Sequence, residues 1–452
     1  MVSDLHLAPA GPLVEFHAHR ALAGLLRHVA DETTPTLLVL NGDVFDTLQL
    51  PGYESLDLVQ AGRRVRELLE SLQHTDRETD VVAAVGAVLT AGHQVLVVPG
   101  NHDPELSLVD AQDALREALA PAPSARLRFH VDDDPWCVEV GARHVVGGHG
   151  HAADPWNALP PSRVLSAQAR GDSTVALPPG SRLVLDVLNP YRRAREPHGT
   201  RRFPFLDLVK PEPAVFWLLW HLDPGLVLRR SGGCLSALAG ATLRSLRRAL
   251  LGGATLSAGF DTVAGTNTAA DDAAMLLLEA LDPEERAAGQ LLCDRLNAAL
   301  DAKPSASPAA PGALALGDWI RRLPLRAFRR AIERDRFFDP QHVDSTCRKA
   351  MEHLPDVEGA VLVTGHTHGA RLLALDGRRA YMNTGTWQDL WLPTAPPEDD
   401  DALEAWVLTL ADGRFPRTRR LTVGRVTEHA VELLAWDEEA DALRPFSPDA
   451  VS

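Results

Sequence analysis

Short apolar runs that end in clusters of Asp, Asn and His constrain this chain more than any other feature. Runs rich in Val and Leu cover residues 37–40, 95–98, 145–146 and 360–364, and a polar cluster follows each of them. The clusters, with one more at the start of the chain, are Asp4-Leu5-His6, Gly42-Asp43-Val44-Phe45-Asp46, Gly100-Asn101-His102-Asp103, His149-Gly150-His151 and Gly365-His366-Thr367-His368. Continuous apolar runs of this length indicate strands that are buried on both faces. Open α/β folds bind ligands at the carboxyl ends of such strands, so we expect the clusters to meet in one site.

Helical patterns separate the apolar runs and predict an α/β fold. The segments with a helical period in the first part of the chain are 16–30, 56–72, 81–90 and 108–119. The further strands expected near the C-terminus are 371–375, 379–382, 405–410, 417–423 and 430–436. Only Met1 to Ser3 precede the first cluster, whereas a strand typically takes about 5–6 residues. The first strand is therefore expected to be truncated or to begin upstream.

The length of the chain predicts more than one structural unit. Its 452 residues exceed what a single core usually holds. Strand patterns mark residues 1–158 and 356–452, which we expect to form one core in two parts. Helical periods dominate residues 159–355, with a low-complexity linker at 301–317, and predict a mostly helical insert or cap.

Charge and cysteine content narrow the classes of partner and compartment. The net charge of −16 disfavours a broad nucleic-acid footprint, which needs clustered Lys and Arg. Cys137, Cys234, Cys293 and Cys347 show no CxxC spacing, so they are expected to be reduced, buried thiols of a cytoplasmic protein. The sequence shows no secretory signal, and no apolar run reaches the roughly 18–20 residues that a membrane span needs.

The clusters contain the side chains that hold divalent metal ions. In Asp4-Leu5-His6 and His366-Thr367-His368 the donors are two residues apart, so at a strand end they share one face. Gly42 permits a tight turn that lets Asp43 reach inward. Oxygen donors combined with imidazoles suit Mn, Fe or Zn. Two such ions some 3.5–4 Å apart polarise a phosphoryl group and activate water at neutral pH, so the sequence predicts a metal-dependent phosphoesterase.

The ordered set of clusters resembles the calcineurin-like metallophosphoesterase superfamily over residues 3–158 and 358–390. The resemblance implies a four-layer α/β/β/α sandwich with a dinuclear metal site at one end. It also implies two sets of ligands that share one carboxylate. One metal would be held by Asp4, His6, Asp43 and His368, and the other by Asp43, Asn101, His149 and His366. Manganese is the expected metal, with iron or zinc as alternatives.

The same resemblance assigns catalytic roles to two further residues. His102 would contact the phosphate and protonate the leaving oxygen, and Asp46 would orient His102. The chemistry of these side chains supports both roles. A histidine suits general acid catalysis near neutral pH, and a nearby carboxylate fixes its tautomer and favours its protonated form. The expected reaction is in-line attack of a metal-activated hydroxide on phosphorus, with no covalent phosphoenzyme.

The string from His149 to Asn157 resembles a loop in bacterial members of the superfamily. His149 is the expected ligand because it follows the run at 145–146 through two glycines, with His151 as the alternative or as a group beside the metals. Asp154 is a candidate for substrate binding, or else for capping a helix. A second family-like string, residues 383–387, is expected to form a tight turn that supports the site.

The substrate expected from the sequence is a small or lipid-linked phosphoester or pyrophosphate. Protein Ser/Thr phosphatases of the superfamily carry an Arg where this chain has Thr47. Bacterial UDP-diacylglucosamine pyrophosphatases share the motif order but have HGD at the position of His149-Gly150-His151. Arg192 and Arg193 are candidates for binding a second phosphate, since Arg matches phosphate geometry, although a solvated surface run is the more ordinary interpretation.

Two other functions fit the sequence less well. A nuclease shares the motif set, but the acidic charge disfavours it. A non-catalytic scaffold is disfavoured because every expected ligand position is filled. Apolar segments at 216–220 and 243–251 fit either the core of the insert or a peripheral contact with a membrane. The sequence does not indicate an oligomeric state.

Overall fold

The computed structural model describes most of the N-terminal part of the chain and much of its C-terminal part. The described residues are 1–9, 11, 16–73, 76, 78–193, 218, 221–222, 325–326, 328–333, 336–343, 345–376, 378–391, 396–411 and 417–447. Contacts divide the chain into two units. The first comprises Met1–Leu185, Arg336–Leu390 and Arg417–Ser452, and the second comprises Asp186–Asp335 and Trp391–Pro416. Most of the insert predicted at 159–355 lies outside the described residues, so its helical character stays a prediction.

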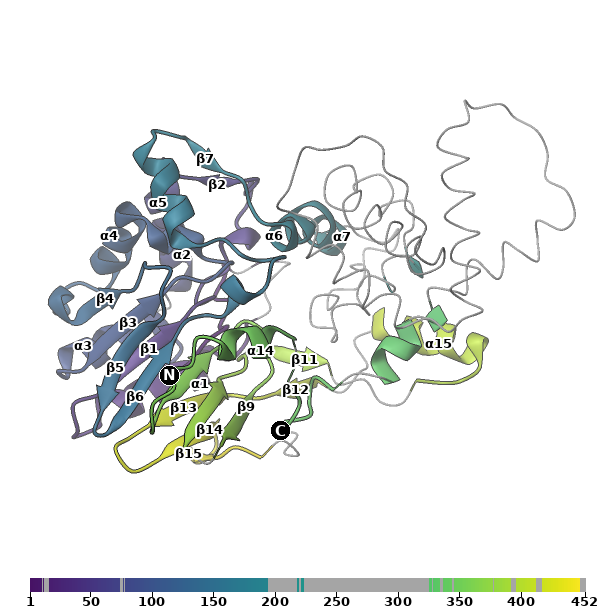
Figure 1. Cartoon of the computed structure of the whole chain (residues 1–452). Coiled ribbons are helices and arrows are strands. Elements are labelled where there is room, and N and C mark those ends of the chain that lie inside the picture. The colour runs from purple at the N-terminus through teal and green to yellow at the C-terminus, as the bar shows by residue number, and fades with distance from the viewer. Residues whose placement is uncertain are drawn as a thin grey trace, which may run out of the picture. The chain divides into compact units, whose positions relative to one another are not determined.

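Two sheets form the centre of the first unit (Figure 1). The first sheet consists of parallel strands in the order β1 (Leu37–Asn41), β3 (Gln94–Val98) and β4 (Leu127–Phe129). The second has the order β5 (Trp136–Val140), β6 (Arg143–Gly147), β8 (Val361–Thr364), β10 (Arg379–Asn383) and β9 (Arg371–Leu375). Strands β6, β8 and β10 are parallel, and β5 and β9 are antiparallel edges. The start of the chain lies along β1, where Val2 bridges Leu40.

Apolar side chains on both faces of the central strands explain how these layers pack. Val39 of β1 and Leu96 of β3 share a core cluster with Val361 of β8 from the other sheet. Their neighbours along the strands, Leu38 and Val95, belong to a different cluster that includes helical residues. Because successive side chains of a strand point to opposite faces, strands that are apolar throughout must be covered on both sides. The prediction of an α/β fold with doubly buried strands is confirmed.

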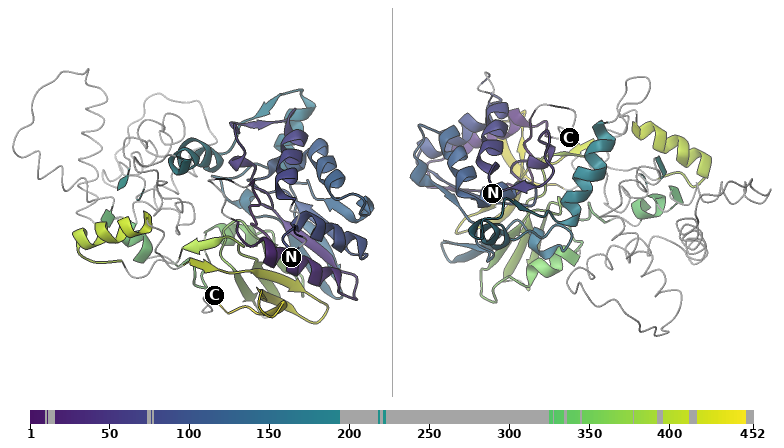
Figure 2. Two further views of the ribbon diagram at one scale, coloured as in Figure 1. Left: turned by 180° about the vertical axis from the view of Figure 1, so that it is seen from behind. Right: turned by 90° about the horizontal axis from the view of Figure 1, so that it is seen from above.

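Helices cover the faces that the sheets do not share. Those whose apolar residues pack on the first sheet are α1 (His19–Ala30), α2 (Ala61–Leu72), α3 (Val81–Thr90) and α4 (Val109–Ala118), visible from behind in Figure 2. On the second sheet, Cys347 and Ala350 of α14 (Ser345–Met351) pack against Leu362 and Tyr381. The expected helix at 56–72 begins late, at Ala61, because Leu56 and Asp57 form a short strand.

The remaining elements are smaller. Strands β2 (Leu56–Asp57) and β7 (Thr174–Val175) form a short antiparallel pair. Strands β11 (Asp389–Trp391) and β12 (Arg417–Arg419) form another two-stranded sheet. A third sheet holds β13 (Thr422–Val426), β14 (Val431–Asp437) and β15 (Ala442–Pro445). The other α-helices in the part of the chain that the structure describes are α5 (Pro161–Ala169), α6 (Pro179–Leu183), α7 (Asn189–Arg193) and α15 (Asp400–Ala411). The strand expected at 417–423 is in fact two strands, β12 and β13.

The strand predicted at 405–410 is wrong, because this segment lies in helix α15. The segment is mostly apolar and contains the strand-favouring residues Trp406, Val407 and Thr409, but the residues before it form a helix start. Oδ1 of Asp399 accepts hydrogen bonds from the backbone N–H groups of Asp401 and Ala402, as an N-cap does. Two acidic residues in the first turn add favourable charge at the helix N-terminus. None of the helices described is both long enough and apolar enough to cross a membrane.

Candidate metal centre

Loops at the carboxyl ends of parallel strands bring the predicted donors together. Asp43 follows β1 and Asn101 follows β3, which are parallel neighbours. His149 follows β6, and His366 follows β8, which are parallel neighbours in the other sheet. Because parallel strands end at the same edge of a sheet, each sheet delivers its donors to one place. The site is therefore built from both sheets.

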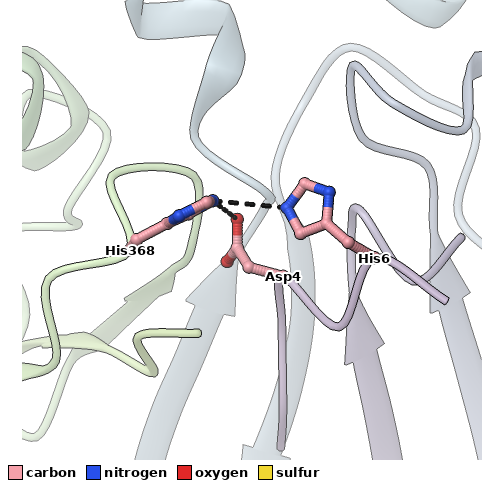
Figure 3. A group of neighbouring side chains, drawn as sticks. All are labelled: Asp4, His6 and His368. Atoms are coloured by element: carbon pink, nitrogen blue, oxygen red, sulfur yellow. Dashed lines mark hydrogen bonds and ion pairs between the residues drawn. The ribbon is translucent and has the colours of Figure 1, made fainter. Parts of the chain in front are cut away.

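Asp4, His6 and His368 form the first group of donors (Figure 3). Nε2 of His368 lies 3.3 Å from Oδ1 of Asp4 and 3.3 Å from Nε2 of His6. Figure 3 shows the carboxylate and both rings directed at one another, although His368 is far from the other two in sequence. One donor atom from each residue lies within 4.8 Å of the others. This group could hold a metal ion.

Asp43, His149 and His366 form a second group of the same size. Nδ1 of His149 lies 3.0 Å from the backbone oxygen of Asn41. A carbonyl oxygen only accepts hydrogen bonds, so Nδ1 carries the proton and Nε2 keeps its lone pair in the neutral ring. That Nε2 lies 3.1 Å from Oδ2 of Asp43. The sequence allowed either His149 or His151 as the ligand, and the group of donors in the structure contains His149.

The charges and an unsatisfied oxygen in the site fit a bound cation. Burial alone would raise the pKa of Asp43, but His149 and His102 hold it well below its usual range. Burial alone would lower the pKa of His149, but Asp43 and Asp4 raise it to about 9, so the carboxylates attract a positive charge, which a metal ion would supply in place of the proton on Nε2. Among the described residues, Oδ1 of Asn101 is buried and has no hydrogen-bond partner. Such an atom in a native site calls for a ligand, a water or an ion.

The backbone at the donors is unusual. Asp4, His6, Asp43, His366 and His368 have φ angles of 52°, 50°, 48°, 66° and 58°. Residues other than glycine rarely adopt this left-handed region, and each instance costs roughly 1–3 kcal/mol. Glycines make room beside these residues, since a Cβ on Gly42 would collide with the ring of His149, and one on Gly100 with the carboxylate and amide of Asp43. The close approach of the loops thus requires glycine at both positions.

His102 and Asp46 lie beside the donors. Nδ1 of His102 is 3.1 Å from Oδ1 of Asp46, and the histidine is 18% exposed. Burial alone would lower the pKa of His102, but Asp46 and Asp43 raise it to about 9. The other carboxylate oxygen of Asp46 accepts a hydrogen bond of 2.7 Å from Gln49 and lies 3.7 Å from Nδ1 of His6. Asp46 therefore contacts a predicted ligand as well as the predicted acid.

Asp103 also supports the site, although no role was predicted for it. Its Oδ2 accepts hydrogen bonds from the backbone N–H groups of Val44 and Phe45, at 2.8 and 3.1 Å. Its Oδ1 accepts one of 2.6 Å from the N–H of Gly100. This fully buried carboxylate ties the loop that carries Asp43 to the loop after β3. The sequence signal that could have indicated this role is the residue type, because Asp readily accepts hydrogen bonds from backbone N–H groups in turns.

Comparison with known proteins identifies the N-terminal part. Residues 1–151 match the calcineurin-like phosphoesterase family. They belong to a calcineurin-like phosphoesterase domain. The domain is that of a hydrolase acting on phosphoesters. The match ends at His151, so the placing of His366 and His368 beside this calcineurin-like phosphoesterase domain comes from the structure. None of the curated proteins compared with the chain matches it.

Of the four residues predicted to bind substrate, two lie beside the metal donors and two lie in the second unit. His151 is buried, its ring centroid lies 5.3 Å from that of His149, and burial lowers its pKa to about 3. Oδ2 of Asp154 lies 3.0 Å from Nε2 of His366. Arg192 is buried in α7 of the second unit, whereas Arg193 is exposed. Substrate binding by these four residues stays a prediction.

The turn at 383–387 supports the loops of the site, as its sequence predicts. The side-chain amide of Asn383 donates to the backbone oxygen of Gly365, and Thr386 Oγ1 donates to that of Asp4, both at 2.7 Å. Trp387 is fully buried and donates through Nε1 to the backbone oxygen of Thr422. The turn therefore holds the backbone at Asp4 and next to His366, which are two predicted ligands.

Replacing Asp154 with Asn is expected to weaken metal binding by about 10–100-fold, the usual cost of losing a carboxylate partner of a ligating histidine. The reason is the contact with His366, which an ionised carboxylate orients more strongly than an amide. Equilibrium dialysis with manganese would measure the change. Asp133→Asn is the matched control, because Asp133 also bonds a nearby backbone N–H group, that of Ser162. Equal affinity in Asp154→Asn and Asp133→Asn would contradict the positioning role.

Proposed function

We propose that the protein hydrolyses a small or lipid-linked phosphoester or pyrophosphate with two divalent ions, manganese being the best candidate. The observation that carries the proposal is the position of the Asp43 carboxylate. Its Oδ2 lies 3.1 Å from Nε2 of His149 and 3.8 Å from Nε2 of His6, which belong to different donor groups. A carboxylate with donors on both sides suits a bridging ligand, because it can give one lone pair to each ion.

The residues available to each ion follow from the two groups. Asp4, His6, Asp43 and His368 would hold one ion, and Asp43, Asn101, His149 and His366 would hold the other. The unsatisfied Oδ1 of Asn101 supports its membership of the second set. With its Nε2–H donated to Asp154, His366 would offer Nδ1. Oxygen and imidazole donors without sulfur favour manganese or iron over softer ions.

The chain's own side chains account for the rest of the chemistry. When bound, a pair of ions supplies Lewis acidity and lowers the pKa of water. His102, protonated at neutral pH by its contacts with the carboxylates, would donate a proton to the leaving oxygen. Asp46 would keep Nδ1 of His102 protonated and turned toward itself, leaving Nε2 to face substrate. The four-layer sandwich belongs to the same proposal, supported by helices on the outer faces of both sheets. The helical cap is proposed from the sequence, because most of it lies outside the described residues.

Adding manganese to metal-free protein is expected to raise its free energy of unfolding by about 2.7 kcal/mol for each bound ion when free metal is 100 times its dissociation constant. The buried carboxylates of Asp4 and Asp43 repel one another without a cation between them. Thermal unfolding followed by circular dichroism, with and without manganese, would measure the change. A melting temperature that does not depend on manganese would contradict metal binding at this site.

A substrate panel tests the proposed function directly. Manganese-loaded protein would be given a generic phosphomonoester, a generic phosphodiester, a nucleoside diphosphate ester, and DNA and RNA. We expect metal-dependent hydrolysis of at least one small substrate and little cleavage of nucleic acid. Preferred cleavage of DNA or RNA would replace the proposal with a nuclease, and no hydrolysis of any phosphoester would overturn it.

A further inference from the structure

A second group of metal-binding side chains lies outside the phosphoesterase site, on the hairpin of β5 and β6. Cys137, Glu139 and His144 each offer a donor atom, and these atoms lie within 4.8 Å of one another. The thiol of Cys137 is free and exposed, so the sequence-based expectation of buried cysteines is wrong at this position. The error arises because Cys137 occupies an edge strand, where one face is open to solvent.

Strand register explains why these side chains meet. Glu139 is directly opposite His144, and Cys137 is opposite Val146. Opposed residues of an antiparallel pair share a face, as do residues two apart along one strand. The neighbouring Trp136 and Val145 point to the other face, where they pack between the sheets. The donors therefore lie together on the outer side of a hydrogen-bonded hairpin.

Distances in the group suit one tetrahedral ion. Sγ of Cys137 lies 3.5 Å from Nε2 of His144. In a tetrahedral zinc site, bonds of about 2.3 Å to sulfur and about 2.0–2.1 Å to nitrogen place those two atoms about 3.6 Å apart. Oε1 of Glu139 lies 2.5 Å from Nδ1, the other nitrogen of the same ring, which is a hydrogen-bond distance. The Glu139 side chain would therefore have to turn to become the third ligand, and all three residues have a donor atom within 4.8 Å of the others.

The alternative use of these residues is a reactive thiol, with His144 as base and Glu139 as its partner. The pKa of the Cys137 thiol argues against it, because partial burial and the Glu139 carboxylate both raise it. A free thiol in this setting is mostly protonated and a poor nucleophile. A bound cation has the opposite effect, since a coordinating thiol loses its proton outright.

We propose that Cys137, Glu139 and His144 form a surface site for a zinc-class divalent ion. The thiolate makes this set softer than the oxygen and imidazole donors of the phosphoesterase site, so the two sites favour different metals. The inference does not depend on the proposed function, because the groups share no residue.

Cobalt absorption tests the proposal without measuring activity. Only a thiolate bound to Co²⁺ gives an intense near-ultraviolet charge-transfer band, and the phosphoesterase donors contain no sulfur. Manganese-loaded protein titrated with Co²⁺ should show this band, and Zn²⁺ should abolish it by displacement. Cys137→Ser should lose the band, and His144→Ala should bind Co²⁺ at least 10-fold more weakly. Asp43→Asn should keep the band, since it alters only the other site.

Two results would overturn the proposal. One is the absence of a thiolate band in the wild-type protein, and the other is an unchanged band in Cys137→Ser. Equilibrium dialysis with Zn²⁺ gives a second readout, because Cys137→Ser should bind one ion fewer per chain than the wild type. Circular dichroism of Cys137→Ser would show that it folds, as expected for a change at an exposed position.

Discussion

His102→Ala is expected to lower kcat by about 10²–10⁴-fold, the usual contribution of a general acid, while the protein keeps its bound metal. The expectation rests on the contact between Nδ1 of His102 and Asp46, and on a pKa of about 9, which keeps the ring protonated at neutral pH. Steady-state kinetics on the best substrate of the panel, with metal content measured on the same sample, would check both parts.

His130→Ala is the matched control for this change. His130 is also 18% exposed and also has an aspartate nearby, Asp132, but it lies in none of the metal-binding groups found among the described residues. It should therefore keep its activity. Loss of metal from His102→Ala would assign His102 as a ligand, which its proximity to His6 and Asp43 would permit. Full activity in His102→Ala would remove it from the mechanism.

Asp43→Asn is expected to release one or both ions and to abolish hydrolysis. Its carboxylate lies between the two donor groups, so the loss in metal affinity should exceed the roughly 10–100-fold that follows from losing an outer partner of a ligand. The amide can still accept the 2.8 Å hydrogen bond from the N–H of His102, so the loop should keep its conformation. Metal analysis after gel filtration and steady-state kinetics would measure the two effects.

Asp376→Asn provides the control for backbone conformation. Asp376 has the same φ of 48° as Asp43, but it lies in the turn between β9 and β10 and pairs with Arg379. Any cost of placing Asn in a left-handed conformation is then common to both variants. Asp376→Asn should keep metal and activity. Metal content that is the same in both variants would show that Asp43 does not bridge the ions.

Strand positions near the site could be predicted because the signal is local. The runs at 37–40 and 95–98 became β1 and β3 almost residue for residue. A run that is apolar throughout predicts a strand in the interior of a sheet, because both of its faces have to be covered. The polar clusters then had to emerge at the strand ends, beyond the apolar core.

Other elements could not be predicted because their signals are ambiguous or distant. Residues 405–410 are mostly apolar and include strand-favouring types, yet the Asp399 cap begins a helix there. The exposure of Cys137 depends on β5 being an edge strand, which no local pattern reveals. Asp103 is one more acidic residue in a polar loop until its partners, the N–H groups of Val44 and Phe45, are known.

The sequence by itself determined which donors this calcineurin-like phosphoesterase domain offers, because residue type and strand-end position are local properties. Only the tertiary structure decided how they combine. His368 meets Asp4, and Asp43 lies between His6 and His149, because two separate sheets end at one place. Contacts between residues hundreds of positions apart depend on packing of the whole core, and no window of sequence contains that information.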